Sequence, residues 1–206
     1  MTTGSVENSP AITDDMRESA LHNPNSWLYV IDPAFDPNSE VPPWGIVGAY
    51  PVNAYGEIES RFAANDTYRP SPRALGWPEP TTQLERMIQL AKAGHRAARE
   101  LPAAVLDAAL LVYQPVDADG RHPTEGLLAF PDRYTGRLVV PACTSVDHVP
   151  ADWPGWRSVR GSDLVDALGE CPLAINADGP ISAIIPAELL RTYADAGRAD
   201  AGRASW

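Results

Sequence analysis

The sequence predicts an α+β protein with a mixed, largely antiparallel sheet and a few short helices. Strand patterns and helix patterns interleave irregularly along the chain, which argues against a doubly wound parallel sheet. The chain contains 21 prolines, and prolines end both kinds of element and stiffen the connections between them. With 206 residues, of which 44% are hydrophobic, the chain is long enough for one ordinary domain or two small ones.

Four segments follow from these patterns. They are a flexible segment at 1–25, a strand pair with a proline-rich arm and helices at 26–104, an α+β domain at 105–194, and a flexible tail at 195–206. The tail repeats the pentad Asp-Ala-Gly-Arg-Ala and lacks large apolar residues before its last position, so we expect it to stay unstructured. Thr13 is in a position to cap a short helix inside the first segment.

In the segment 26–104, runs of β-branched and aromatic residues predict an antiparallel strand pair at 26–31 and 44–50. The stretch 60–80 carries closely spaced prolines and is predicted to be extended, because the residue before a proline favours extended geometry. Thr82 and the glutamate three residues later form a capping-box pattern before an amphipathic helix. Gly94 is expected to end that helix, and Pro102 to begin the next one.

In the C-terminal part, short apolar runs between turn residues predict several strands and two helices. The strands are expected at 108–114, 126–130, 137–144, 156–159, 173–176 and 181–185. The helices are expected at 162–168, capped by Ser162, and from Pro186 to about Ala194. An Asp-Gly-Pro turn between the last two strands is a strong hairpin signal.

The charge balance limits the kind of partner. There are 27 acidic and 16 basic residues, which gives a formal net charge of −11. Such a chain lacks the basic face that a general nucleic-acid-binding protein needs. Residues 61–99 differ, because they hold seven basic residues against three acidic ones. This positive stretch suits either an acidic partner or internal pairing with the acidic flanks.

The sequence indicates neither a membrane nor an oxidising compartment. No apolar run approaches the roughly 20 residues of a membrane span, and the first ten residues lack the pattern of a signal peptide. The two cysteines, Cys143 and Cys171, are too few for a disulfide framework and suit a reducing compartment. We therefore expect a cytoplasmic protein without membrane insertion. Its oligomeric state stays open, a homo-oligomer included.

Motifs for familiar chemistry are missing from the sequence. There is no phosphate-binding glycine loop and no nucleophile elbow, and the four histidines are widely separated, so neither a metal nor a cofactor is expected. One nucleophile pattern remains, because Cys143 ends a predicted strand and His148 follows five residues later. The other interpretation of Cys143 is a small thiol packed in the core.

The arm at 60–80 is the predicted binding surface. Tyr68, Arg69, Arg73 and Trp77 combine hydrogen-bond donors, positive charge and flat rings on a backbone that prolines stiffen. This composition is typical of a surface that binds another protein. The alternative is an arm that wraps its own domain, with both aromatic rings buried and the arginines paired to nearby glutamates.

Several short strings resemble a known group of proteins. The strings in the C-terminal part that resemble the SseB-like N-terminal domain are 136–145, 162–168 and 173–180. The upstream strings that resemble actinobacterial proteins associated with type VII secretion are 27–33, 43–48, 68–72 and 75–80. The chain departs from the usual pattern at Cys143, where an aromatic residue is common, and after Asn176, where a proline is common.

The resemblance covers about residues 26–193 and implies a cytoplasmic accessory or adaptor protein of a secretion locus, without catalytic residues. The leading hypothesis is therefore a non-enzymatic protein that binds a secretion component or a secreted substrate. The first alternative is an enzyme or small-ligand-binding protein whose pocket uses Cys143 with His148, or Tyr68 with Arg69. The second alternative is an immunity-type protein, since an acidic protein suits a basic toxin.

Overall fold

The computed structural model describes residues 9–115, 119, 126–177 and 179–203, and the chain divides into two compact units. Unit 1 comprises residues 1–78 and unit 2 comprises residues 79–206. Each unit contains its own sheet, and all strand pairs except one are antiparallel, which confirms the predicted α+β class. The division falls earlier than the boundary at 104/105 that the sequence predicts.

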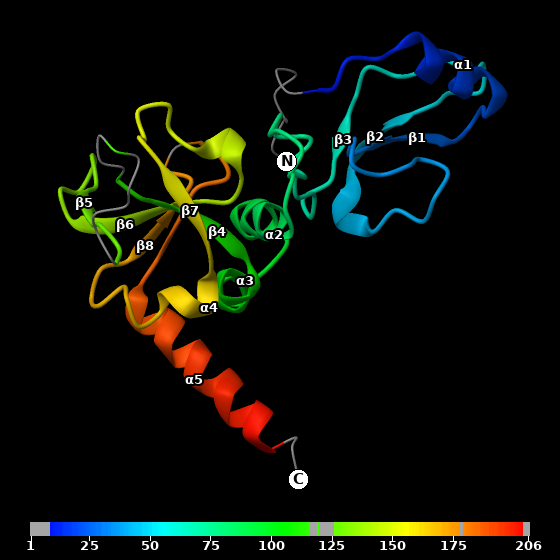
Figure 1. Cartoon of the computed structure of the whole chain (residues 1–206). Helices are drawn as coiled ribbons and strands as arrows, with labels where there is room; N and C mark the ends of the chain where they lie inside the picture. The colour runs from blue at the N-terminus through cyan, green and yellow to red at the C-terminus, as the bar shows by residue number, and fades with distance from the viewer. Residues whose placement is uncertain (1–8, 116–118, 120–125, 178, 204–206) are drawn as a thin grey trace. The chain divides into compact units, whose positions relative to one another are not determined.

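Unit 1 is built on a three-stranded sheet in the order β1-β2-β3 (Figure 1). Its elements are α1 (Asp14–His22), β1 (Trp27–Ile31), the short helix η2 (Pro43–Gly45), β2 (Ile46–Pro51) and β3 (Ala63–Ala64). The antiparallel β1–β2 pair confirms the predicted strand pair. Thr13 caps α1 by accepting a hydrogen bond from the Met16 N–H, so part of the segment predicted to be flexible is helical. Residues 1–8 of that segment lie outside the described residues.

The arm at 60–80 is less extended than predicted. After β3, residues 72–76 form turns, in which the N–H groups of Leu75 and Trp77 donate to the carbonyls of Ser71 and Pro72, both at 3.0 Å. The hydroxyl of Ser71 accepts a hydrogen bond from Ala74. Ser71 thus acts as an N-cap and Pro72 occupies the first position of a helical turn, where a proline is favoured.

Unit 2 contains a sheet in the order β7-β4-β6-β8-β9, with β5 beside β6. Its strands are β4 (Ala109–Tyr113), β5 (Phe130–Pro131), β6 (Leu138–Cys143), β7 (Trp156–Arg160), β8 (Leu173–Ile175) and β9 (Ala183–Ile185). Only β6 and β8 run parallel. The predicted strands are all present, although the one expected at 126–130 is reduced to β5. The β8–β9 pair confirms the predicted hairpin.

The helices of unit 2 are α2 (Gln83–Lys92), η3 (Ala98–Glu100), α3 (Leu101–Asp107), η4 (Val146–His148), α4 (Gly161–Leu164) and α5 (Ala187–Arg203). Thr82 caps α2 as predicted, by accepting from the Glu85 N–H. The predicted cap of Ser162 on α4 is wrong, because α4 begins at Gly161 and has no side-chain cap. A Cβ at Gly161 would lie 1.8 Å from the carbonyl oxygen of Val105, so only glycine fits this contact between α3 and α4.

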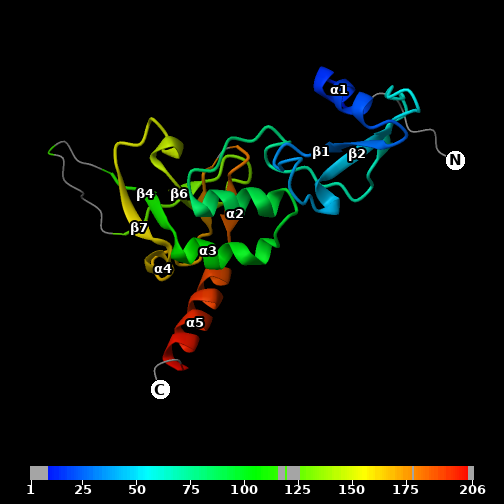
Figure 2. The same ribbon diagram turned by 90° about the vertical axis from the view of Figure 1, so that its right-hand side faces the viewer.

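Helix α5 runs to Arg203, through most of the predicted tail. Alanine and arginine are good helix formers, and Asp195 pairs with Arg198 at 2.7 Å, one turn apart. A helix that is already nucleated needs no apolar contact to continue through such residues. Its later turns leave the sheet in Figures 1 and 2. Residues 204–206 of the predicted tail lie outside the described part of the chain.

The apolar core of unit 2 lies on one face of its sheet, which we call the core face. Helices α2 and α3 lie side by side against this face (Figure 2), and the first turns of α5 join them. The fully buried side chains of this core include Ile88, Val105, Leu110, Val112, Leu173, Ile175 and Leu190. Because side chains alternate along a strand, the residues between them point to the opposite face, which we call the open face.

Candidate functional site

A cavity of about 720 Å³ lies over the open face of the unit 2 sheet. We call it the sheet groove. Its floor is formed by alternate residues of the central strands, Pro141 and Cys143 of β6 and Ala174 of β8, and by Ile184 of β9. These positions are small or apolar, and none carries a charge. The floor is therefore a flat apolar surface that water solvates poorly.

Three aromatic rings form one wall of the sheet groove. The Tyr113 ring meets Phe130 at 5.0 Å and 75°, and it meets Trp153 at 5.4 Å and 87°. Both contacts have the edge-to-face geometry that aromatic pairs prefer. Phe130 is held in the β5–β6 ladder opposite Val139, and the backbone of Trp153 closes a turn onto Pro150. The wall is thus fixed before any ligand arrives.

The rim of the groove carries charged side chains, and several of them already have partners. The carboxylate of Asp132 accepts hydrogen bonds from Tyr134 and from the backbone and hydroxyl of Thr135, and the bonds from Thr135 are the main cause of its lowered pKa. Lys92 donates to the Ser182 hydroxyl at 3.1 Å, and partial burial lowers the pKa of its amine. These two charges hold the rim in place.

The structure brings Cys143 and His148 together at the groove, but not as a nucleophile and its base. The thiol of Cys143 donates to the backbone carbonyl of His148 at 3.2 Å. Burial raises the pKa of Cys143 to about 11, so the thiol stays protonated near neutral pH. The His148 ring instead lies beside Glu85, with 3.5 Å between Nε2 and Oε1.

Glu85 forms the centre of a buried polar network beneath His148. Its carboxylate accepts hydrogen bonds from the Thr144 hydroxyl at 2.5 Å and from the backbone N–H and the hydroxyl of Thr81 at 2.6 and 3.0 Å. Burial alone would raise the pKa of Glu85, but these bonds and His148 hold it below its usual value. Asn176 completes the network by binding Thr144 through its amide oxygen and nitrogen.

This network was not foreseen from the sequence, where Glu85 was expected only to cap α2. One half of the predicted capping box is present, because Thr82 accepts from the Glu85 N–H, but the Glu85 carboxylate accepts from Thr81. However, its carboxylate is used by Thr144, which lies 59 residues away. No pattern within one segment marks such a pair. Its effect is to fix the chain that leaves β6 and carries His148 towards the groove.

The four predicted binding residues of the arm belong to unit 1 and serve different roles. Tyr68 donates its hydroxyl to the fully buried carboxylate of Asp32 at 2.9 Å. Burial and this hydrogen bond raise the pKa of Tyr68 to about 12. Trp77 is half-buried, whereas Arg69 and Arg73 are exposed. The contact of Tyr68 therefore agrees with the second interpretation of the arm, in which the arm wraps its own unit.

Asp32 is the residue that sequence reasoning missed in unit 1. The backbone N–H and the hydroxyl of Ser71 both donate to it, at 2.8 and 2.5 Å, and Ala34 donates at 2.9 Å. Burial alone would raise the pKa of Asp32, but the bonds from Ser71, Ala34 and Tyr68 hold it below its usual value. The carboxylate therefore ties the arm to the end of β1.

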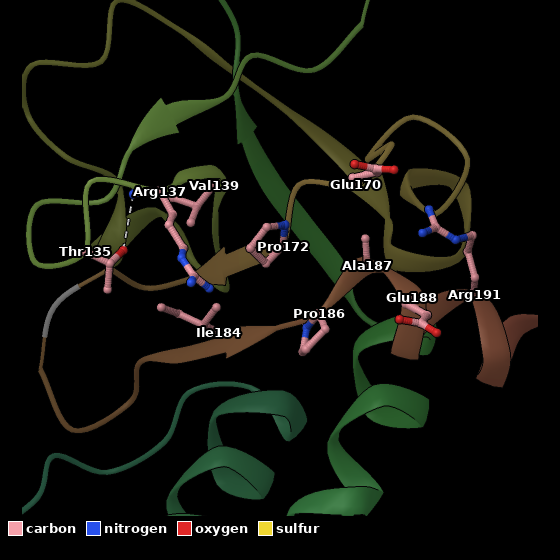
Figure 3. A pocket seen from close by; sticks show the side chains of 10 residues that line it. All are labelled: Thr135, Arg137, Val139, Glu170, Pro172, Ile184, Pro186, Ala187, Glu188 and Arg191. Carbon is pink, nitrogen blue, oxygen red and sulfur yellow. Dashed lines mark hydrogen bonds between the residues drawn. The ribbon is translucent and has the colours of Figure 1, made fainter.

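A second cavity of about 540 Å³ adjoins the sheet groove, because Val139 and Ile184 line both. Figure 3 shows its side chains, with Arg137 on one side and Glu170 and Glu188 on the other. We call it the Arg137 cavity. It extends the groove along the open face towards the start of α5.

Neither cavity has the composition of a metal site. Over the residues that the structure describes, no three histidine, cysteine, aspartate or glutamate side chains gather as metal ligands. Within the same ranges, no helix is both long and apolar enough to cross a membrane. Comparison with known protein families, with curated proteins and with solved structures finds no match to this chain.

Proposed function

We propose that this chain is a non-catalytic binding protein whose sheet groove receives an apolar segment of another protein. The observation that carries the proposal is the fixed wall of Tyr113, Phe130 and Trp153 beside an uncharged sheet floor. Aromatic side chains in a preformed hollow are typical of the residues that contribute most of the energy of protein–protein binding. Because the wall is ordered in advance, a partner loses little entropy in ordering it.

The size of the groove indicates that it receives a short segment of a partner rather than the surface of a whole domain. A hollow of about 720 Å³ has room for a few large side chains. The charged residues of the rim surround the apolar floor, which is the usual arrangement of a protein interface, with an apolar centre and a polar border. A partner that places apolar side chains on Pro141 and Ala174 would remove this floor from water.

The alternative of covalent chemistry at Cys143 has less support. The thiol is buried, protonated and bonded to a carbonyl, whereas a nucleophilic cysteine needs a lowered pKa and a base within reach. A small apolar molecule would fit the same hollow, so it is the competing occupant in the test below.

The resemblance to proteins associated with type VII secretion supports a cytoplasmic adaptor of a secretion locus as the setting of this activity. In that setting the partner is a secretion component or a secreted substrate. The exposed Arg73 of the arm is then a candidate secondary contact, whereas the hydroxyl of Tyr68 is bonded to Asp32. We therefore place the principal contact in the sheet groove.

The test is affinity capture from the native cell with the intact protein and with paired variants. Trp153→Ala and Phe130→Ala each remove part of the groove wall, and Tyr55→Ala removes an exposed aromatic ring of unit 1 as a matched control. We expect one protein to be retained by the wild type and by the control, and to be lost with both groove variants. Circular dichroism confirms that each variant is folded.

Equal capture by the groove variants would contradict the proposal. Loss of a co-purifying small molecule from the groove variants, with every protein partner retained, would assign the hollow to a small ligand instead.

A further inference from the structure

We propose that the partner segment carries an acidic side chain next to its apolar residues, and that Arg137 binds this carboxylate. The inference rests on the proposed function and adds to it the chemistry of the partner. It is carried by the position, surroundings and lack of internal pairing of Arg137.

The sheet groove and the Arg137 cavity form one continuous surface. Val139 and Ile184 line both, and Arg137, which directly precedes β6, lines the Arg137 cavity beside Val139. From Cys143 to Arg137 the path along β6 is about 20 Å, at roughly 3.3 Å a residue. A single extended segment of about six residues spans this surface.

The guanidinium of Arg137 has no partner within the described part of the chain. Its backbone N–H donates to the Thr135 hydroxyl at 3.3 Å and its carbonyl accepts from Asp132 at 2.8 Å, but its side chain makes neither an ion pair nor a hydrogen bond there. In Figure 3 the side chain extends between Val139, Pro172 and Ile184. Arg137 is exposed, so a partner can reach its charge.

The charges of the Arg137 cavity are divided between its two sides. Glu170 and Glu188 lie across the cavity from Arg137, on the side where Arg191 is found (Figure 3). Arg191 donates to the Gly169 carbonyl at 2.5 Å, which holds it there. At the other end of the groove Asp152 stands next to Trp153. Within the cavity a partner carboxylate is thus attracted on the Arg137 side and repelled on the side of Glu170 and Glu188.

The chemistry of the side chain fits this role. An arginine presents parallel N–H donors that match the two oxygens of a carboxylate, and such paired bonds are stronger and more directional than those of a lysine. Lys92 on the rim is already bonded to Ser182. Arg137 therefore offers its guanidinium for a bidentate contact with a carboxylate.

The experiment selects 12-residue peptides from a random library displayed on a carrier, with the full-length protein as bait. The strongest sequences are made as synthetic peptides with acetylated and amidated ends, and their Kd is measured by fluorescence polarisation. We expect each to hold aromatic or aliphatic residues and at least one Asp or Glu. Arg137→Glu should weaken their binding at least tenfold, whereas Arg86→Glu, on the exposed side of α2, should change it less than twofold.

A charge exchange completes the test. Peptides in which Arg replaces the acidic residue should bind Arg137→Glu better than the wild type. Selected peptides without acidic residues, or equal binding by Arg137→Glu, would overturn the assignment of Arg137 while the groove itself stands. Peptides that bind Trp153→Ala as well as the wild type, or a library without any binder, would overturn the proposed function and this inference with it.

Discussion

The two units of this protein stabilise their sheets in different ways. Among the described residues, unit 1 buries only Ala20, Ala49, Tyr50 and Val52 as apolar side chains, and it ties its arm to β1 through the buried carboxylate of Asp32. Unit 2 buries sixteen apolar side chains in one cluster on the core face. A small unit thus relies on a polar centre, whereas a larger one relies on apolar area.

This difference explains where a binding surface can form. Because the core of unit 2 lies on one face of its sheet, the open face is free to carry an apolar hollow without loss of the fold. In unit 1 the aromatic and polar groups of the arm are needed to hold the unit itself, as Tyr68 shows. In unit 2 the core and the proposed binding surface therefore lie on opposite faces of the sheet, whereas in unit 1 the predicted binding residue Tyr68 also holds the fold.

The largest effect is expected from a cavity in the core of unit 2. Leu110 is completely buried in β4, and Leu110→Ala should lower the free energy of unfolding of unit 2 by about 3–4 kcal/mol, through lost apolar contact and the space left behind. Hydrogen exchange of the β4 and β6 amides measures this loss. The control Leu138→Ala removes an exposed leucine and should cost less than about 0.5 kcal/mol. Similar losses in the two variants would show that the cluster does not dominate the stability of unit 2.

The next effect concerns the polar centre of unit 1. Asp32→Asn should destabilise unit 1 by about 2–3 kcal/mol, because the charge-assisted hydrogen bonds from Ser71 and Tyr68 are weakened or lost. The pKa of Asp32 is lowered in the folded state. Its contribution is therefore present above its unfolded pKa of about 3.9 and is lost as the pH falls further.

Urea unfolding monitored by the amides of β1 and β2, at pH 7 and at pH 3, measures both the size and the pH dependence. The wild type should lose stability between these pH values, and Asp32→Asn should lose less. Asp66→Asn, on the exposed turn after β3, is the control. If Asp32→Asn lost as much stability between pH 7 and pH 3 as the wild type, Asp32 would not be the group that stabilises unit 1.

A smaller effect is expected in the polar network of unit 2. Thr144→Val removes the hydroxyl that joins Glu85 to Asn176 and should cost about 1–2 kcal/mol. Thr144→Ser keeps the hydroxyl and should recover most of this loss. The difference between the two variants, measured by chemical denaturation, isolates the hydrogen bonds from the packing of the methyl group. Equal losses would mean that packing, and not the network, matters at this position.

The smallest effect is expected for thiol labelling. With a pKa of about 11, only about one Cys143 thiol in a thousand is ionised at pH 8. Iodoacetamide should therefore modify the half-buried Cys171 first and leave Cys143 unmodified until the protein unfolds. Peptide mapping by mass spectrometry distinguishes the two sites. Rapid labelling of Cys143 in the folded protein would restore the hypothesis of a nucleophile.

Local features of this fold could be predicted from the sequence, and non-local ones could not. Thr13 and Thr82 cap the helices that follow them, because a cap depends on neighbouring residues alone. The β8–β9 hairpin is predicted for the same reason. The parallel pairing of β6 with β8 depends on segments about 30 residues apart, and no local pattern specifies it.

The candidate site shows the same limit. Cys143 and His148 are close in the sequence and do lie together at the groove, although their atoms make a different contact from the one expected. The aromatic wall joins Tyr113 of β4, Phe130 of β5 and Trp153 of the connection before β7. Two partners of Asp32, Tyr68 and Ser71, are 36 and 39 residues away. Recognising such sets requires the strand order, which the sequence pattern alone does not contain.

Lys92 is the only lysine of the chain, and its side chain lies on the rim of the sheet groove. An amine-reactive dye or crosslinker can therefore be attached at one side-chain position without any mutation. Partial burial lowers the pKa of this amine, which leaves more of it uncharged and reactive at mildly alkaline pH than an ordinary lysine. Lys92 thus offers a natural reporter for whatever enters the hollow beside it.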